Sequence, residues 1–325
     1  MVQQASGHKY FVGLAYDRLG VGPALVLLHG IGHRRQAWDA VLDRITPYRD
    51  VILVDLPGHG ESPPLRLAGR SVAQALVQDF LDFLDEIGLD RPHLAGNSLG
   101  GRLALETAAA GRAASVTALS PAGFWKSPAE LSYARAVNGA MRVAGRLVRP
   151  LGPAMSRTTV GRALIYAEIV SRPSKVSPEQ AVGDMAAFLE ASDATKTILA
   201  AATPFIGTIP DGVPVTIGWG TRDRLLPPRQ GLVAKERLPQ ARLVALPGCG
   251  HVPMTDDPRL VANVLLRGSR ATPGRVSQRV KVGLSRCAGR RRGVRPFVVG
   301  RVTMHGRLGA SVPKHARYAV TLRIP

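Results

Sequence analysis

Two kinds of hydrophobic pattern alternate over the first 120 residues of the chain. Unbroken apolar runs, typical of strands buried on both faces, occupy residues 12–16, 24–28, 51–54, 93–95 and 116–119. Helical patterns lie between them. The clearest spans residues 72–87, where apolar side chains recur with a 3.6-residue period and Gly88 follows as a candidate C-cap. Strands that alternate with helices predict a mostly parallel sheet with right-handed crossovers.

The alternation stops near Pro121, and the chain is helical in pattern from there to about Gly212. Strand patterns resume at residues 215–219 and 243–246. A helical block placed late in a strand–helix alternation indicates an excursion from the sheet. We therefore expect an α/β protein with flanking helices, whose core comprises residues 1–120 and 213–266 and whose residues 121–212 form a helical cap, or lid.

One segment of that block separates apolar from basic side chains on a helix. The apolar face holds Ala134, Val137, Met141, Ala144 and Val148, and the other holds Arg135, Arg142, Arg146 and Arg149. Such a helix either contacts lipid or an acidic partner, or packs its apolar face on the core and leaves its arginines in solvent. Because Gly139 and Gly145 weaken the helix, we favour the second interpretation.

Charge is concentrated at the C-terminal end. The 325-residue chain has a net charge of +20, but residues 259–325 contain 16 Lys and Arg and no Asp or Glu. The preceding residues, with 27 basic and 23 acidic side chains, have a net charge of only +4. Residues 267–325 sustain no hydrophobic period and are expected to be a basic tail that is disordered or foreign to the fold. An extension produced by altered reading of the gene is an alternative.

Composition excludes several classes of protein. No run of about 18 apolar residues predicts a transmembrane helix. The first residues lack a secretion signal, and two cysteines form neither a disulfide framework nor a four-ligand zinc site, so a cytoplasmic location is expected. No nucleic-acid-binding motif is present, so we expect no specific nucleic-acid partner. Contact of the basic tail and lid with membranes or polyanions would be weak and driven by charge.

The segment Gly96-Asn97-Ser98-Leu99-Gly100-Gly101 joins a strand pattern to a helical one. A serine between glycines at such a junction can occupy a strained turn that exposes its hydroxyl at the carboxyl end of the sheet. The backbone N–H of Leu99 would then face a developing oxyanion at a helix N-terminus. The alternative for Ser98 is an ordinary helix N-cap.

A serine nucleophile needs a base, and His251 is the best candidate. It lies in a glycine-rich loop after the strand pattern at residues 243–246, where a rigid scaffold can hold a catalytic group. His29 and His59 also sit beside glycines at strand ends, so position alone does not exclude them.

The candidate acid is Asp223, which follows the strand pattern at residues 215–218 and could accept the Nδ1 proton of His251. Its alternative role is that of an exposed turn residue paired with Arg222 or Arg224. Asp256 and Asp257 are closer to His251 in sequence, but their place at a helix start predicts capping.

The segment His29-Gly30-Ile31-Gly32 follows another strand pattern, at residues 24–28. Its glycines permit a loop in which the amide of Ile31 points into a pocket. With the amide of Leu99, this would supply two donors for one oxyanion.

Together these elements make the sequence resemble the lidded α/β-hydrolases of the esterase and C–C hydrolase type over about residues 10–266. The resemblance implies Ser98 as nucleophile, His251 as general base, Asp223 as its partner, and Ile31 and Leu99 as oxyanion amides. It implies no metal and no organic cofactor. Residues 55–62 resemble the family's segment that shapes the sheet end and the pocket wall.

The implied reaction is hydrolysis of a small apolar ester, or a related acyl compound, through an acyl-enzyme. Asn97 before the serine also occurs in family members that cleave C–C bonds of vinylogous diketones, but residues 30–34 lack the Gly-Pro-Gly run common in that group. Thioesterase and perhydrolase activities would use the same residues. Serine at position 98 disfavours the family's epoxide hydrolases and haloalkane dehalogenases, which use aspartate. The non-enzymatic alternative is a ligand-binding protein on a hydrolase scaffold.

Overall fold

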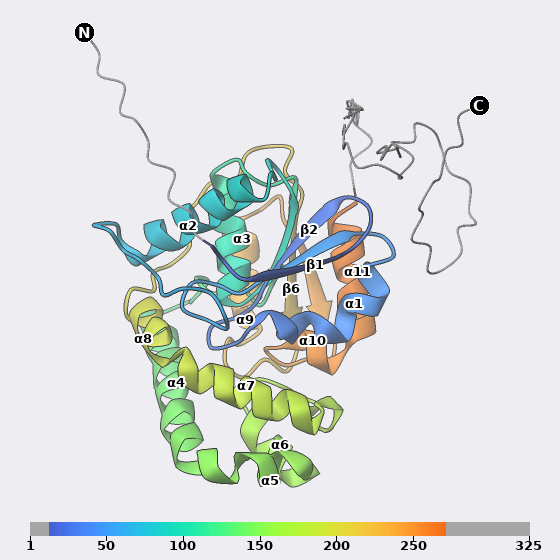
Figure 1. Cartoon of the computed structure of the whole chain (residues 1–325). Helices are drawn as coiled ribbons and strands as arrows, with labels where there is room; N and C mark the ends of the chain where they lie inside the picture. The colour runs from blue at the N-terminus through green and yellow to red at the C-terminus, as the bar shows by residue number, and fades with distance from the viewer. Residues whose placement is uncertain (1–12, 271–325) are drawn as a thin grey trace, which may run out of the picture. The chain divides into compact units, whose positions relative to one another are not determined.

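A seven-stranded sheet forms the centre of the part of the chain that the computed structural model describes, residues 13–270 (Figure 1). Its strands are β1 (Tyr16–Gly20), β2 (Ala24–Leu28), β3 (Asp50–Val54), β4 (His93–Asn97), β5 (Ser115–Leu119), β6 (Val215–Gly220) and β7 (Arg242–Leu246). They lie in the order β1-β3-β2-β4-β5-β6-β7, and all neighbours are parallel except β1, which runs antiparallel to β3. The mostly parallel sheet expected from the sequence is confirmed.

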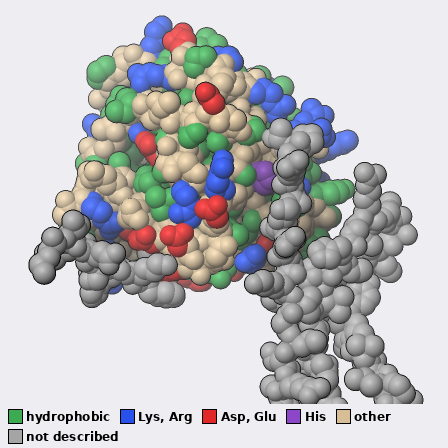
Figure 2. Space-filling view, turned by 90° about the horizontal axis from the view of Figure 1, so that it is seen from above, with side chains coloured by type: hydrophobic (Ala, Val, Ile, Leu, Met, Phe, Trp, Pro, Cys, Tyr) green, Lys and Arg blue, Asp and Glu red, His purple; other side chains and the backbone are tan. Residues whose placement is uncertain are grey.

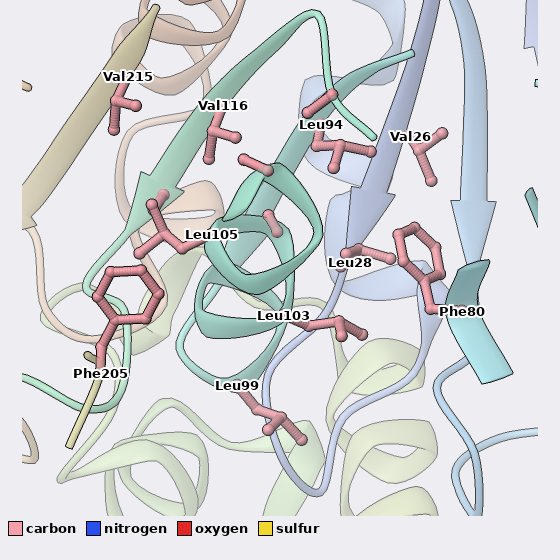
Figure 3. Packing of buried hydrophobic residues seen from close by; sticks show 14 of the residues in the cluster. Val26, Leu28, Phe80, Leu94, Leu99, Leu103, Leu105, Val116, Phe205 and Val215 are labelled. Carbon is pink, nitrogen blue, oxygen red and sulfur yellow. The ribbon is translucent and has the colours of Figure 1, made fainter. Parts of the chain in front are cut away.

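Helices cover both faces of the sheet (Figure 1). The flanking helices are α1 (Asp39–Ile45), α2 (Val72–Glu86), α3 (Leu99–Ala109), α9 (Arg229–Arg237), α10 (Pro253–Asp256) and α11 (Pro258–Gly268). Alternate residues of β2 belong to different hydrophobic clusters: Val26 and Leu28 join one, and Leu25 and Leu27 join the other. Figure 3 shows the first cluster, where side chains of α3 pack on the strands. The unbroken apolar runs follow from this burial on two faces.

The first strand is displaced from its expected position. The apolar run at residues 12–16 predicts a strand there, whereas β1 is Tyr16–Gly20 and most of its residues are exposed. An edge strand pairs on one side only and does not need a continuous apolar sequence. Leu14 is buried just before the strand, so part of the run packs in the core without joining the ladder.

Helix α2 begins and ends as its pattern indicates. Ser71 and Gln74 form a reciprocal capping box at its start. Gly88 adopts a φ of 73° after its end, a conformation that glycine reaches without a steric penalty.

The helical insertion comprises Pro128–Ala200, between β5 and β6, and lies beyond the carboxyl ends of the strands (Figure 1). It contains α4 (Pro128–Val148), α5 (Gly152–Arg157), α6 (Thr159–Tyr166), α7 (Pro178–Glu190) and α8 (Ser192–Ala200), with short 3-10 turns η2 (Arg149–Leu151) and η3 (Pro173–Lys175). A further 3-10 turn, η1 (Arg35–Trp38), precedes α1. Among described residues, no helix is long and apolar enough to cross a membrane.

The arginine face of α4 is largely exposed, as the favoured interpretation expects: Arg135, Arg146 and Arg149 are exposed, and Arg142 is partly buried. Arg135 donates to the carbonyls of Leu199 and Ala200, while Arg142 and Arg146 donate to the carbonyl and hydroxyl of Ser192. What the sequence did not show is that three of these exposed or partly buried arginines also reach acceptors at the two ends of α8.

The expected core boundary at residue 266 falls inside an ordered helix, because α11 continues to Gly268. Ser269 is also buried and accepts a hydrogen bond from Arg49 Nε at 3.0 Å. The rest of the expected tail, residues 271–325, lies outside the described residues. A deletion that tests the tail should therefore begin at Ala271.

Candidate active site

Ser98 occupies a strained turn between β4 and α3. Its backbone has φ 53° and ψ −113°, a conformation that residues other than glycine rarely adopt. Its hydroxyl makes no capping hydrogen bond to α3, so the N-cap interpretation does not apply. A Cβ on Gly96 would collide with the backbone of Gly100, and one on Gly100 would collide with the Leu28 carbonyl. The two glycines are therefore required by the close approach of strand, turn and helix.

Replacing Gly100 with alanine should lower the free energy of unfolding by about 1–3 kcal/mol, because backbone must move to admit the methyl group. The matched control is Gly139→Ala in α4, where an added Cβ meets no atom within 4 Å. That change should raise stability by about 0.5–1 kcal/mol. Chemical denaturation of both variants measures the contrast, and equal stability would contradict the close approach.

His251 and Asp223 form a buried pair. Nδ1 of His251 lies 2.8 Å from Oδ2 of Asp223, and Oδ1 of the same carboxylate accepts the backbone N–H of Leu226 at 2.8 Å. Asp223 forms no ion pair with Arg222 or Arg224 in the described chain, so it is not the exposed turn residue of the alternative interpretation. A carboxylate at Nδ1 holds a proton there and leaves Nε2 free to accept one.

The loop that carries His251 is anchored by residues that the sequence analysis did not assign to the site. Asn97 Nδ2 donates to the backbone carbonyl of His251 at 2.8 Å and to that of Leu119 at 3.1 Å. Asp256 accepts the backbone N–H of Gly250 at 2.7 Å. Asn97 therefore links the turn of the serine directly to the loop of the histidine.

Only one of the two predicted capping aspartates is a cap. Asp257 accepts the backbone N–H of Leu260 at 3.0 Å and caps α11 as expected. Asp256 is fully buried and also accepts the backbone N–H groups of Ser171 and Arg172. It ties the histidine loop to the helical insertion.

Ser98 and His251 line the same small cavity of about 30 Å³, together with Gly30, Ile31 and Asn97. Within the described residues, no hydrogen bond joins the Ser98 hydroxyl to the imidazole. Catalytic hydrogen bonds are often long before substrate binds and tighten in the reacting complex. The structure thus brings the predicted nucleophile, base and acid to one place.

Of the two residues with predicted oxyanion amides, Ile31 lines this cavity, and Leu99 directly follows Ser98 as the first residue of α3. A Cβ on Gly30 would lie 3.3 Å from Cβ of Ser98, so the loop that carries Ile31 passes directly beside the serine. Neither the Ile31 nor the Leu99 N–H donates a hydrogen bond to a described residue. Both donors are therefore free to bind an oxygen atom.

His29 supports the loop that carries Ile31, and both of its ring nitrogens have hydrogen-bond partners. Its Nε2 accepts the backbone N–H of Leu56 at 2.9 Å, so Nδ1 carries the proton and donates to the Gly30 carbonyl at 2.7 Å. Burial, followed by the nearby His59, lowers the pKa of His29 well below its ordinary value. The neutral ring fixes the Gly30 carbonyl and with it the direction of the next amide.

Other candidate residues have structural roles. Burial lowers the pKa of His59 to about 4, and its Nδ1 lies 3.0 Å from the Pro57 carbonyl. Cys249 is buried, which raises the pKa of its thiol to about 11 and leaves it unreactive. Trp38 belongs to the core, whereas Trp125 lines a cavity next to Ser98.

Residues 55–62 form a braced loop at the end of β3. The buried carboxylate of Asp55 forms an ion pair with Arg35 and accepts the backbone N–H of Glu61 at 3.0 Å. Gly60 leaves no room for a Cβ beside this carboxylate. The loop therefore supports the sheet end and contributes no reacting group.

Two larger apolar cavities meet the catalytic cavity. One, of about 100 Å³, is lined by Ser98 and apolar residues of α2, α3 and α8. The other, of about 280 Å³, lies among α4, α5, α6 and α7. It shares His33, Met141, Ile169 and Phe188 with the catalytic cavity. Ser98 therefore borders one apolar cavity directly, and the other shares lining residues with the catalytic cavity.

His33 and Asp184 are polar exceptions in the larger cavity, and the sequence analysis did not identify them. The Asp184 carboxylate accepts a 2.7 Å hydrogen bond from the Tyr166 hydroxyl. Nδ1 of His33 is buried without a partner, and burial lowers the pKa of this residue. Among described residues, no group of three His, Cys, Asp or Glu side chains is arranged to hold a metal ion.

Comparison with known proteins places the chain among hydrolases. Residues 25–264 match the model of the alpha/beta hydrolase family. The pimeloyl-[acyl-carrier protein] methyl ester esterase of Xanthomonas campestris is 28% identical over 79% of this chain and 99% of its own. The epoxide hydrolase EphH of Mycobacterium tuberculosis is 34% identical over 60% of this chain and 94% of its own. The crystal structure of a bacterial membrane phospholipase A superposes with a TM-score of 0.61 at 25% identity, over 78% of this chain and 82% of that one.

Proposed function

The chain belongs to the alpha/beta hydrolase family, and from this premise we propose that it is a serine hydrolase that cleaves an apolar carboxylic ester through an acyl-enzyme. The observation that carries the proposal is the buried pair of His251 and Asp223 in the cavity of a strained serine. A core that needed only stability would not require a buried carboxylate beside a histidine.

In the proposed mechanism, Ser98 attacks the ester carbonyl while Nε2 of His251 takes the hydroxyl proton. The carboxylate of Asp223 stabilises the imidazolium that forms. The amides of Ile31 and Leu99 hold the oxyanion, and each such donor typically contributes about 3–4 kcal/mol of transition-state stabilisation. His251 then returns the proton to the departing alkoxide. Water, activated by the same imidazole, attacks the acyl-enzyme and frees Ser98.

Three features support an ester over the alternative substrates. An apolar cavity at Ser98 and a second one that adjoins the catalytic cavity fit the acyl and alcohol parts of an apolar ester. Asn97, the residue shared with C–C hydrolases, already uses its amide to hold the backbone at Leu119 and His251, which accounts for its presence without a diketone. A relative is an epoxide hydrolase, but position 98 here carries a hydroxyl and not a carboxylate.

A substrate panel tests the proposal. We expect p-nitrophenyl esters to be hydrolysed with kcat/KM values that rise with acyl chain length from acetate to octanoate, because a longer chain buries more apolar surface beside Ser98. A vinylogous diketone of the ring-cleavage type, an acyl thioester and a peroxide co-substrate are run beside them. A diketone turned over faster than every ester would show C–C hydrolysis, and binding of esters without turnover would show a ligand-binding protein.

A further inference from the structure

The far end of the helical insertion carries an exposed apolar surface. We call it the tip surface, and it consists of Val143, Leu147, Leu151, Val160 and Leu164. Each of these side chains is between 60% and 76% exposed. They lie on the last turns of α4, on η2 and on α6, which form the part of the insertion farthest from the sheet (Figure 1). Large apolar side chains gathered in this way mark an interaction surface.

Helix geometry explains how one segment serves both a surface and a cavity. Val143 and Leu147 are four residues apart and share one face of α4. Ala144 and Val148 share the next face and line the 280 Å³ cavity. The end of α4 is therefore apolar on its outer side as well as on its inner side.

The cavity connects this end of the insertion with the catalytic serine. Leu164 belongs to the tip surface and also lines the 280 Å³ cavity. Met141 and Phe188 line both that cavity and the catalytic cavity, in which Ser98 and His251 meet. The tip surface, the 280 Å³ cavity and the catalytic cavity are thus neighbours that share lining residues, most of them apolar.

The segment that carries the tip surface is rich in basic side chains and has no acidic ones. Residues 131–167 contain six arginines and no Asp or Glu. None of the six forms an ion pair with a described residue, and Arg149 and Arg157 are exposed without a hydrogen-bond partner there. The opposite side of the molecule, seen in Figure 2, carries acidic and basic side chains intermixed.

We propose that the tip surface docks on an anionic lipid bilayer and that the adjoining cavity takes an apolar ester from that membrane to Ser98. The delivery of an ester to Ser98 rests on the proposed esterase function, whereas the docking on a bilayer does not. Exposed leucine and valine side chains fit the acyl region, and arginines at their margin fit anionic headgroups. A second copy of the chain is a poorer occupant, because a two-fold contact through the tip surface would bring the exposed Arg149 and Arg157 of both copies into one interface without acidic partners.

Vesicle flotation of the full-length protein tests the docking. The tip variant combines Leu147→Gln, Leu151→Gln and Val160→Gln, none of which lines a cavity that contacts Ser98. The control combines Ile206→Gln and Leu232→Gln, which are 84% and 60% exposed outside the insertion. Both variants keep residues 271–325, so any binding by the basic tail is equal in the two.

We expect the tip variant to lose at least about tenfold in partition onto phosphatidylglycerol-containing vesicles, because three apolar anchors are removed. The control should bind as the wild type does, and all three proteins should hydrolyse p-nitrophenyl butyrate in solution equally. Hydrolysis of a long-chain ester embedded in the same vesicles should fall only in the tip variant.

Equal partition of the tip variant and the wild type would overturn the proposal. So would a wild-type dimer in analytical ultracentrifugation that the tip variant converts to monomer, because a second copy would then cover the surface. Vesicle binding is measured without turnover, so a protein that binds through the tip but hydrolyses no ester contradicts the proposed function and leaves the docking intact.

Discussion

Replacing Ser98 with alanine is expected to reduce kcat for ester hydrolysis by about 10⁶-fold, the loss typical of removing a serine nucleophile. The fold should survive, because the Ser98 hydroxyl makes no hydrogen bond to α3 and the methyl group of alanine fits the same turn. Residual rate would come from the oxyanion amides and substrate binding alone. Steady-state turnover of p-nitrophenyl butyrate, with circular dichroism to verify folding, measures the effect.

Ser120→Ala is the matched control for this experiment. Ser120 directly follows the neighbouring strand β5, is fully buried and also has a positive φ, of 42°. It lines none of the cavities that contain Ser98. The control should retain the wild-type rate. A folded Ser98→Ala protein with near wild-type turnover would remove the basis of the proposed function.

Replacing Asp223 with asparagine should lower kcat by about 10⁴-fold, the loss typical when the histidine is held in the wrong tautomer. The reason lies in the second hydrogen bond of the carboxylate. Oδ1 accepts the Leu226 N–H at 2.8 Å, so an amide at this position keeps its oxygen there and turns its NH2 group toward His251. Nδ1 must then accept, the proton moves to Nε2, and the base is blocked.

The pH dependence of kcat is measured for Asp223→Asn beside the wild type, to test whether the loss comes from the changed tautomer of His251. Asp257→Asn is the control, because an asparagine oxygen can still accept the Leu260 N–H and cap α11. The control should show wild-type turnover. Equal turnover in both variants would mean that Asp223 does not orient the histidine.

The sheet and the candidate site were open to prediction because they depend on local patterns. Each of β2 to β5 is an apolar run ended by a turn, and Ser98, Asp223 and His251 each follow a strand. In a parallel sheet the carboxyl ends of strands share one edge, so residues far apart in sequence converge there. The position of β1 was not predicted correctly. This strand lies at the edge of the sheet, pairs on one side only and has no continuous apolar run.

What the sequence did not reveal depends on contacts between distant elements. Asn97 resembles a family signature, but its role comes from the carbonyls of Leu119 and His251, which a single sequence does not place. The hydrogen bonds that the α4 arginines make to the ends of α8 depend on where α8 lies. Periodicity gives two faces of a helix and does not say which of them finds a partner.

The reactivity of Ser98 itself tests the central claim most directly. A fluorophosphonate should form one covalent adduct per chain, and peptide mapping by mass spectrometry should place it on Ser98. His251→Gln should suppress the labelling, because the hydroxyl then lacks the base that the buried pair with Asp223 provides. No adduct, or an adduct at another serine with Ser98 unmodified, would contradict the account.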